Sequence, residues 1–199
     1  DELGNVVDGD QIMAIVGAHM RNMGKLKQNT IVATVMSNLG LFLFGEKEKI
    51  HIEKTKVGDR YVLERMREIG ASLGGEQSGH IIFSKHARTG DGILTSLMVM
   101  EAILEKKQSL GTLADEVKIF PQLLKNVRVK DERTALDNEA VQKAIEQTAE
   151  ELGSDGRILV RESGTEPVIR VMVEAASDEI CEKYVDGVVK IFEQEGLCE

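Results

Sequence analysis

The order of strand-like and helical segments constrains the fold of this 199-residue chain more than any other feature. Up to Pro121, apolar runs rich in β-branched residues alternate with helical ones, which is typical of a mainly parallel sheet covered on both faces. Beyond Pro121 the order is strand, helix, two strands joined by a polar loop, and helix. The sequence therefore predicts an α/β domain with a mixed or parallel sheet, followed by a small α+β domain of β-α-β-β-α order.

The expected domain boundaries follow from this change of pattern. Residues 9–120 are predicted to form the first domain and residues 121–199 the second. Residues 1–7 are predicted to form a hairpin that turns at Gly4 and Asn5. Because a lone hairpin is marginal in water, we expect residues 1–8 to be the remnant of a preceding domain, and the chain to be a piece of something longer.

Composition excludes several classes of partner. The 34 acidic and 25 basic residues give a net charge of −9, which disfavours nucleic acid and anionic membranes as partners. No apolar run approaches the roughly 20 residues that span a bilayer, and no signal peptide is evident. The two cysteines fit a reducing compartment, so we expect a cytoplasmic protein. A local phosphate site remains compatible with the net charge, because it needs only a few donors.

The segment from Arg161 to Arg170 is a candidate phosphate site. A strand leads into a loop in which Ser163 and Thr165 provide hydroxyl donors, and Gly164 allows backbone N–H groups to point inward. Arg161 and Arg170 flank this loop, and guanidinium groups bind phosphate oxygens in pairs. On composition alone, a polar hairpin turn with exposed arginines is an equally good interpretation.

A second candidate is the glycine-rich segment 74–80. Glu76 and Ser78 are spaced to project the same way from an extended chain, and a carboxylate beside a hydroxyl suits a sugar diol or an ammonium group. Gln77 and His80 complete the set of polar side chains. Without further information, a turn whose side chains face water is the better interpretation, because glycine-rich turns are common.

Three weaker signals each precede a predicted helix. They are Ser37 with Asn38, Asp59 with Arg60, and Asp91. Ligands in open α/β sheets bind near the carboxyl ends of strands, but helix capping by Asn38, Asp59 and Asp91 is the favoured interpretation. Capping does not explain Arg60, which makes its loop the most suggestive of the three.

Asp8 and Asp10 have the spacing of two carboxylates that share a magnesium ion. Asp10, however, precedes a helical apolar pattern, and the expected role of this residue is that of an N-cap.

The two main motifs together, in this order and with 89–92 between them, resemble the α-D-phosphohexomutases. Gln77 and the segment 57–61 resemble the bacterial phosphoglucosamine mutases within that family. The resemblance covers essentially the whole chain. It implies four domains around a cleft, of which residues 1–8 would end domain two, 9–120 would be domain three and 121–199 domain four.

The resemblance also implies roles for the candidate residues. Sugar recognition would fall to Glu76, Gln77, Ser78 and His80, and phosphate docking to Arg161, Ser163, Gly164, Thr165 and Arg170. Arg60 and His80 are the candidates for proton transfer, and Ser37, Asp59 and Asp91 are further cleft candidates.

The implied reaction interconverts glucosamine 6-phosphate and glucosamine 1-phosphate through glucosamine 1,6-bisphosphate, on the route to UDP-N-acetylglucosamine and the cell wall. In the family, the phosphorylated serine and the Mg²⁺ loop precede the segment that this chain matches. We therefore expect no metal ligands here and an inactive fragment, with a homodimer left open for the full-length enzyme. The alternatives are the same region of a phosphomannomutase or phosphoglucomutase paralogue, and a non-catalytic phosphosugar-binding module.

Overall fold

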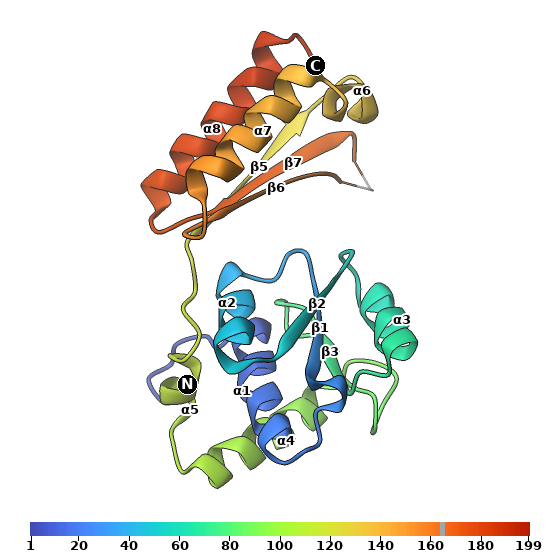
Figure 1. The fold of residues 1–199 in the computed structure, drawn as a ribbon, viewed down its shortest axis with the longest axis vertical. Helices are drawn as coiled ribbons and strands as arrows, with labels where there is room; N and C mark the ends of the chain where they lie inside the picture. Colours follow the sequence, from blue (N-terminus) through green and yellow to red (C-terminus); the bar gives the residue numbers. More distant parts are fainter. Residues whose placement is uncertain (164–165) are drawn as a thin grey trace. The chain divides into compact units, whose positions relative to one another are not determined.

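The computed structural model describes residues 1–163 and 166–199, which form two compact units, Asp1–Ile119 and Phe120–Glu199 (Figure 1). The elements of the first unit are α1 (Gly9–Asn22), the 3-10 helix η1 (Lys27–Asn29), β1 (Thr30–Thr34), α2 (Leu39–Glu48), β2 (His51–Thr55), α3 (Asp59–Ile69), β3 (Leu73–Gly75), β4 (Ile81–Phe83), α4 (Gly92–Lys106) and α5 (Leu110–Ala114). Those of the second are β5 (Gln122–Arg128), α6 (Glu132–Leu136), α7 (Glu139–Leu152), β6 (Arg157–Glu162), β7 (Val168–Glu174) and α8 (Asp178–Gln194). The predicted fold class, an α/β domain followed by a small α+β domain, is confirmed.

The sheet of the first unit is mixed and has the strand order β2-β1-β3-β4. β1 is parallel to β2 and to β3, whereas β4 runs antiparallel to β3. Parallel strands end at the same edge, so the chain leaves β1, β2 and β3 at Thr34, Thr55 and Gly75 on one side of the sheet. The candidate residues that follow these strands are thereby brought to one edge.

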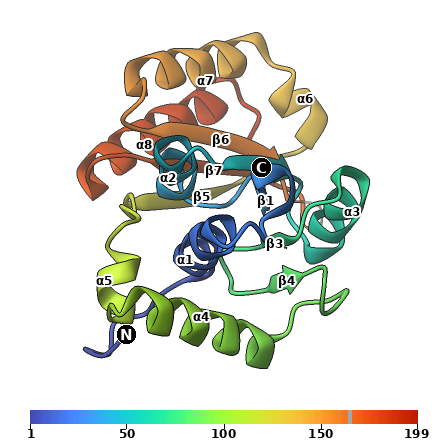
Figure 2. The same cartoon turned by 60° about the horizontal axis from the view of Figure 1, so that its bottom comes forward.

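Alternate residues of β1 face opposite layers of helices. Ile31 and Ala33 lie in a core built with α1, α2 and α4, and Val32 packs with Val62 and Met66 of α3 on the other face. All five residues of β1 are buried, as a strand covered on both faces requires. α4 packs against α1 in the same core, and in Figure 2 it lies below α1.

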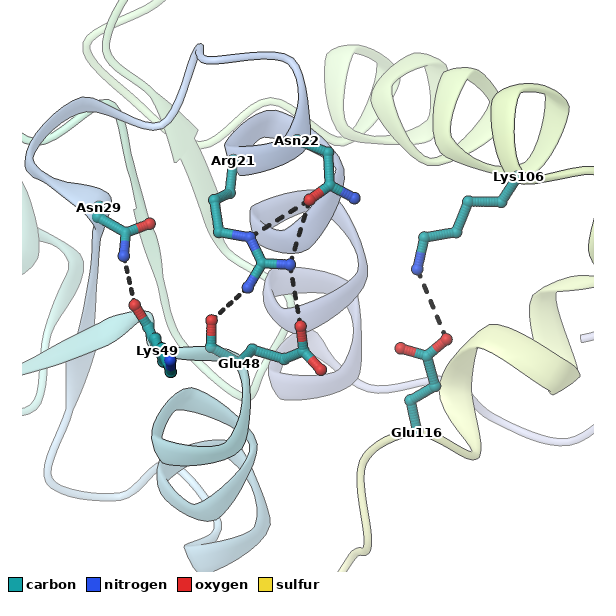
Figure 3. A network of polar contacts seen from close by, with 7 residues as sticks. All are labelled: Arg21, Asn22, Asn29, Glu48, Lys49, Lys106 and Glu116. Atoms are coloured by element: carbon teal, nitrogen blue, oxygen red, sulfur yellow. Dashed lines mark hydrogen bonds and ion pairs between the residues drawn. The ribbon is translucent and has the colours of Figure 1, made fainter.

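Polar contacts hold the opposite edge of this sheet together, where β1 and β2 begin (Figure 3). The guanidinium of Arg21, in the last turn of α1, donates to the main-chain carbonyl of Glu48 and lies 2.9 Å from its carboxylate. The side-chain amide of Asn29 donates to the carbonyl of Lys49. These contacts satisfy carbonyl groups that the end of α2 leaves without helical partners.

The second unit has a three-stranded antiparallel sheet in the order β5-β7-β6, with α7 and α8 along one of its faces (Figure 1). Ile169 and Val171 of β7 pack against Val185 and Phe192 of α8. Since side chains alternate along a strand, Arg170 projects from the face opposite these helices. The short helix α6 was not anticipated from the sequence pattern.

The structure corrects three local predictions. Residues 1–7 form a turn and contain no strand; the Asp1 carboxylate accepts the N–H groups of Leu3 and Asn5, and such local hydrogen bonds compete with strand pairing. Asp10 is not an N-cap: Asp8 caps α1, and Asp10 is buried within the helix. Asp59 is the first residue of α3, whose N-cap is Gly58.

Asn38 and Asp91 do cap α2 and α4 as predicted. Helix α5 is short and ends at Ala114. Across the part of the chain that the structure describes, no helix is both long and apolar enough to cross a bilayer.

Candidate functional site

A tight turn of residues 76–80 joins β3 to β4 at the edge where the parallel strands end. The N–H of Glu76 donates to the carbonyl of His80 at 3.1 Å, and the N–H of Gly79 donates to the carbonyl of Glu76 at 2.9 Å. Gly79 has φ 94°, a left-handed conformation that other residues adopt only with strain. The turn thus presents Glu76, Gln77 and Ser78 in sequence along one loop.

The Glu76 side chain connects this turn to the beginning of α3. Its Oε1 accepts the N–H of Gly58 at 3.0 Å, and its second oxygen makes no hydrogen bond to the described residues. Glu76 is only partly buried. One carboxylate oxygen is therefore fixed, while the other is available to a hydroxyl or ammonium group.

Gln77 connects the turn to the beginning of α1. The N–H of Gly9 donates to the carbonyl of Gln77 at 2.9 Å, and the Gln77 amide donates to Asp8 at 3.3 Å. A Cβ at Gly9 would lie 2.1 Å from the carbonyl oxygen of Glu76. Sequence reasoning missed this supporting role of Asp8 and Gly9; its only signal was a glycine between two aspartates.

His80 lies between the loops that precede α3 and α4. Its Nε2 accepts the N–H of Gly90 at 3.1 Å and is 3.4 Å from Oδ2 of Asp59. The His80 side chain is 38% exposed. A Cβ at Gly90 would lie 2.6 Å from the imidazole, so Gly90 is the residue that lets this loop approach the ring.

The structure thus brings Asp59, Glu76, Gln77 and His80 together and leaves other candidates apart. Arg60 turns to Glu64 on the exposed side of α3, at 2.8 Å, and this hydrogen bond raises the pKa of its guanidinium.

The remaining candidates of the first unit are placed differently again. Ser37 is fully buried, Ser78 is exposed, and Asp91 holds the N–H of Leu94 as the cap of α4. Asn38, next to Ser37, donates its N–H to the buried carboxylate of Asp10 at 2.6 Å.

In the second unit, Arg161 and Arg170 lie directly opposite each other on the antiparallel strands β6 and β7. The Nε atoms of both guanidinium groups are buried and have no hydrogen-bond partner among the described residues. Burial and, secondarily, the neighbouring Arg170 lower the pKa of Arg161. Two cations side by side with unused donors form a site that an anion would complete.

The same pair of strands also holds a matched pair of charges. Arg157 lies opposite Glu174, and their side chains meet at 2.7 Å and 3.0 Å in a bidentate contact. Glu174 is fully buried. On these two strands, Arg157 is thus paired with a carboxylate, whereas Arg161 and Arg170 lie opposite each other.

The rest of the predicted phosphate loop is described only in part. Ser163 is buried, and its N–H donates to the carbonyl of Val168 at 3.0 Å. Gly164 and Thr165 lie outside the described residues.

Magnesium, which the family resemblance implies, finds no matching donors in the described part of the chain. No group of three or more histidine, cysteine, aspartate or glutamate residues there could hold a metal ion. The spacing of Asp8 and Asp10 suggested a metal site, but the two residues have different roles. Asp8 caps α1, and the buried Asp10 accepts the N–H of Asn38 at the start of α2.

Comparison with known proteins places both units in one family. Residues 8–120 match the model of "Phosphoglucomutase/phosphomannomutase, alpha/beta/alpha domain III", and residues 124–191 match that of "Phosphoglucomutase/phosphomannomutase, C-terminal domain". The phosphoglucosamine mutases of Lachnoclostridium phytofermentans and Oceanobacillus iheyensis are 56% and 50% identical over 98% of the chain. The chain spans 44% of the length of these relatives.

Solved structures share the fold. The chain resembles Aspergillus fumigatus N-acetylphosphoglucosamine mutase, described in complex with GlcNAc-6P and magnesium, with a TM-score of 0.76 at 23% identity over 98% of this chain and 46% of that one. A structure of the same enzyme with glucose 1,6-bisphosphate gives a TM-score of 0.74 at 24% identity, over 97% and 44%. The chain therefore belongs to the phosphoglucomutase/phosphomannomutase family and comprises its domain III and its C-terminal domain.

Proposed function

We propose that this chain is the sugar-phosphate-binding part of a phosphoglucosamine mutase, an isomerase that interconverts glucosamine 6-phosphate and glucosamine 1-phosphate through a bisphosphate. The identity of 56% to a curated phosphoglucosamine mutase supports this choice within the family. Arg161 and Arg170, with Ser163, Gly164 and Thr165, bind the phosphate. Glu76, Gln77, Ser78 and His80 bind the sugar.

The single observation that carries the proposal is the pair Arg161 and Arg170. Neighbouring cations with unused, buried donors are costly unless an anion accepts their hydrogen bonds. A phosphate offers several oxygens to two guanidinium groups at once. Binding of this non-reacting phosphate positions the other end of the substrate for reaction.

Glu76 is the proposed determinant for the amino sugar. With one oxygen fixed by the N–H of Gly58, its other oxygen accepts a hydrogen bond from the ammonium or a hydroxyl of the sugar. The neighbouring imidazole of His80, near Asp59, is held for contact with a second hydroxyl. These are binding and positioning roles for residues of this chain.

Calorimetric titration of the 199-residue chain with glucosamine 6-phosphate tests the phosphate assignment. Arg170→Ala should weaken binding by about 1.5–3 kcal/mol, the range for a charged hydrogen bond. Arg133→Ala is the matched control, because Arg133 is an exposed cation of the same unit. Equal affinity of Arg170→Ala and the unmodified chain would contradict the assignment.

A second comparison separates the amino-sugar enzyme from a paralogue that acts on neutral sugars. Glucosamine 6-phosphate should bind more tightly than glucose 6-phosphate, and Glu76→Gln should remove that preference while phosphate-dependent binding persists. A preference for glucose 6-phosphate or mannose 6-phosphate would assign the chain to the paralogue.

Turnover separates a mutase part from a self-contained binding module. We expect the 199 residues alone to leave glucosamine 6-phosphate unchanged over hours, as followed by ³¹P NMR, since phosphoryl transfer requires a metal or equivalent charge neutralisation. A protein that joins this chain to the remaining length of its relatives should convert it. If that longer protein also bound without converting, the catalytic assignment would fail.

A further inference from the structure

Two adjoining hollows lie at the edge of the first unit's sheet where β1 and β3 begin, the edge opposite the 76–80 turn. One has a volume of about 470 Å³ and the other about 360 Å³, within or near the size range of small-molecule sites. They share Lys27 and Ser84 as lining residues. The pair of hollows, which we call the basal hollows, is not used by the proposed function.

The basal hollows are lined by cations although the whole chain is acidic. The larger is bordered by Lys25, Lys27 and Lys85, and the smaller by Lys27, Arg67 and Arg88. A single carboxylate, that of Glu101, is among their lining residues. In a chain with 34 acidic and 25 basic side chains, this local excess of positive charge favours an anionic ligand.

Two of these cations have structural explanations and three do not. Lys25 lies 3.4 Å from Glu101, and Arg67 is in the last turn of α3, where a cation complements the helix dipole. Lys27, Lys85 and Arg88 have no carboxylate within 4.0 Å in the described part of the chain. These three side chains are free to bind a polyanion.

The floor of the larger hollow is apolar. Met20, Phe83 and Met98 line it, and Met20 and Phe83 are buried. The hydroxyls of Ser72 and Ser84 donate to main-chain carbonyls, those of Lys25 and Ala71. Because these hydroxyl protons are already used, recognition of an anionic ligand depends on the lysine and arginine side chains. The methionine and phenylalanine side chains suit a flat apolar ring.

Glu101 supplies the one carboxylate among the lining residues of the larger hollow. Its Oε1 is 3.4 Å from Nζ of Lys25 and 3.7 Å from Nε2 of the buried His19. That Nε2 atom has no hydrogen-bond partner among the described residues. An amino or hydroxyl group on a ring bound over Met98 can donate to this carboxylate. The hollow thus combines an apolar floor, an acceptor and a cationic rim.

From this combination we propose that the basal hollows are a second binding site, for a nucleoside phosphate. The ring lies on Met20, Phe83 and Met98, and the phosphates bind Lys27, Lys85 and Arg88. The site is at the opposite edge of the sheet from the sugar-binding residues, so it is occupied independently of glucosamine 6-phosphate.

Calorimetric titration of the 199-residue chain with ADP tests the site without any sugar phosphate present. Lys27→Gln and Arg88→Gln should each weaken ADP binding by about tenfold, since each removes a charged hydrogen bond. Both side chains are exposed, so both variants should keep the circular dichroism spectrum of the unmodified chain. Arg133→Gln, an exposed cation of the other unit, should leave ADP binding unchanged.

Other outcomes would overturn the proposal. Inorganic pyrophosphate that binds as tightly as ADP would remove the role of the apolar floor. Loss of ADP binding in Arg170→Ala, with Lys27→Gln and Arg88→Gln unaffected, would place ADP at the phosphate site of the second unit. Absence of ADP binding at millimolar concentration would exclude the site without contradicting the binding of glucosamine 6-phosphate at Arg161 and Arg170.

Discussion

On one face of the sheet, β6 and β7 carry two pairs of residues that lie opposite each other. One pair joins an arginine to a glutamate, and the other joins two arginines. Arg157 faces Glu174, and four residues along the strand Arg161 faces Arg170. The sequence singles out Arg161 and Arg170 because they flank the candidate phosphate loop, but it does not show which residues face them across the strands. Only the register of the antiparallel strands shows that Arg157 is paired with a carboxylate, whereas Arg161 and Arg170 lie opposite each other.

Stability measurements should separate these two kinds of arginine. Arg157→Ala removes the bidentate ion pair to the buried carboxylate of Glu174 and should lower the free energy of unfolding by about 3–5 kcal/mol. Arg161→Ala removes a like-charge contact and should leave that free energy unchanged or raise it when no anion is present. Urea denaturation without phosphate checks both values, and a larger loss for Arg161→Ala than for Arg157→Ala would contradict the interpretation.

Glycine at position 90 has a specific consequence for His80. Gly90→Ala would place a methyl group 2.6 Å from the imidazole, so the ring or the loop must shift from its present position. We expect a changed His80 ring signal in NMR spectra and weaker binding of glucosamine 6-phosphate, by about 1 kcal/mol or more. Gly92→Ala is the matched control, since a Cβ there meets open space; an equal effect of both variants would point to the loop backbone instead.

At the scale of elements, sequence patterns located most of the helices and strands, because burial of one face spaces the apolar residues with the period of a helix or a strand. The caps Asn38 and Asp91 were correct at this level. The hairpin expected over 1–7 was wrong because strand pairing depends on a neighbouring strand, which local residues do not specify. α6 was missed because five residues are too few to show a helical period.

The candidate site was less predictable than the fold. The sequence singled out Glu76 and His80 but favoured a simple turn, because the contacts that organise the turn come from Gly58, Gly90 and Gly9. Those residues lie outside the 76–80 segment, and a single glycine in a sequence does not indicate which residue its backbone contacts. Arg60 stood out only because capping did not explain it, and its partner Glu64 was not considered.

Helix α4 carries an apolar stripe on its exposed side. Ile93, Leu97, Met100 and Leu104 are 78%, 55%, 48% and 75% exposed. Leu97→Glu should change the free energy of unfolding by no more than about 0.5 kcal/mol, as is usual for a surface substitution. Ala102→Glu on the buried side of the same helix should cost several kcal/mol, because it buries a charge.

Thermal denaturation of the two variants checks this contrast. A large loss of stability in Leu97→Glu would show that the stripe is covered in the isolated chain.

At the scale of the whole molecule, each unit has a hydrophobic core of its own. The largest core of the first unit joins α1, α2 and α4 to the sheet, with Met13, Leu41 and Phe83 among its members. The core of the second joins β7 and α8 through Val171, Val185 and Phe192. No residue of either cluster, within the described part of the chain, comes from the other unit. Separate cores are the physical basis for separate folding.

Residues 120–199 should therefore fold when produced alone. We expect a cooperative urea transition, since a sheet of three strands covered by α7 and α8 buries a continuous core. The matched control is Val185→Asp, which places a carboxylate in that core and should abolish the transition. The isolated unit should also bind inorganic phosphate through Arg161 and Arg170, with Arg170→Ala weaker by about tenfold. A fragment that lacks helical circular dichroism, or resembles Val185→Asp, would show that the second unit depends on the first for its fold.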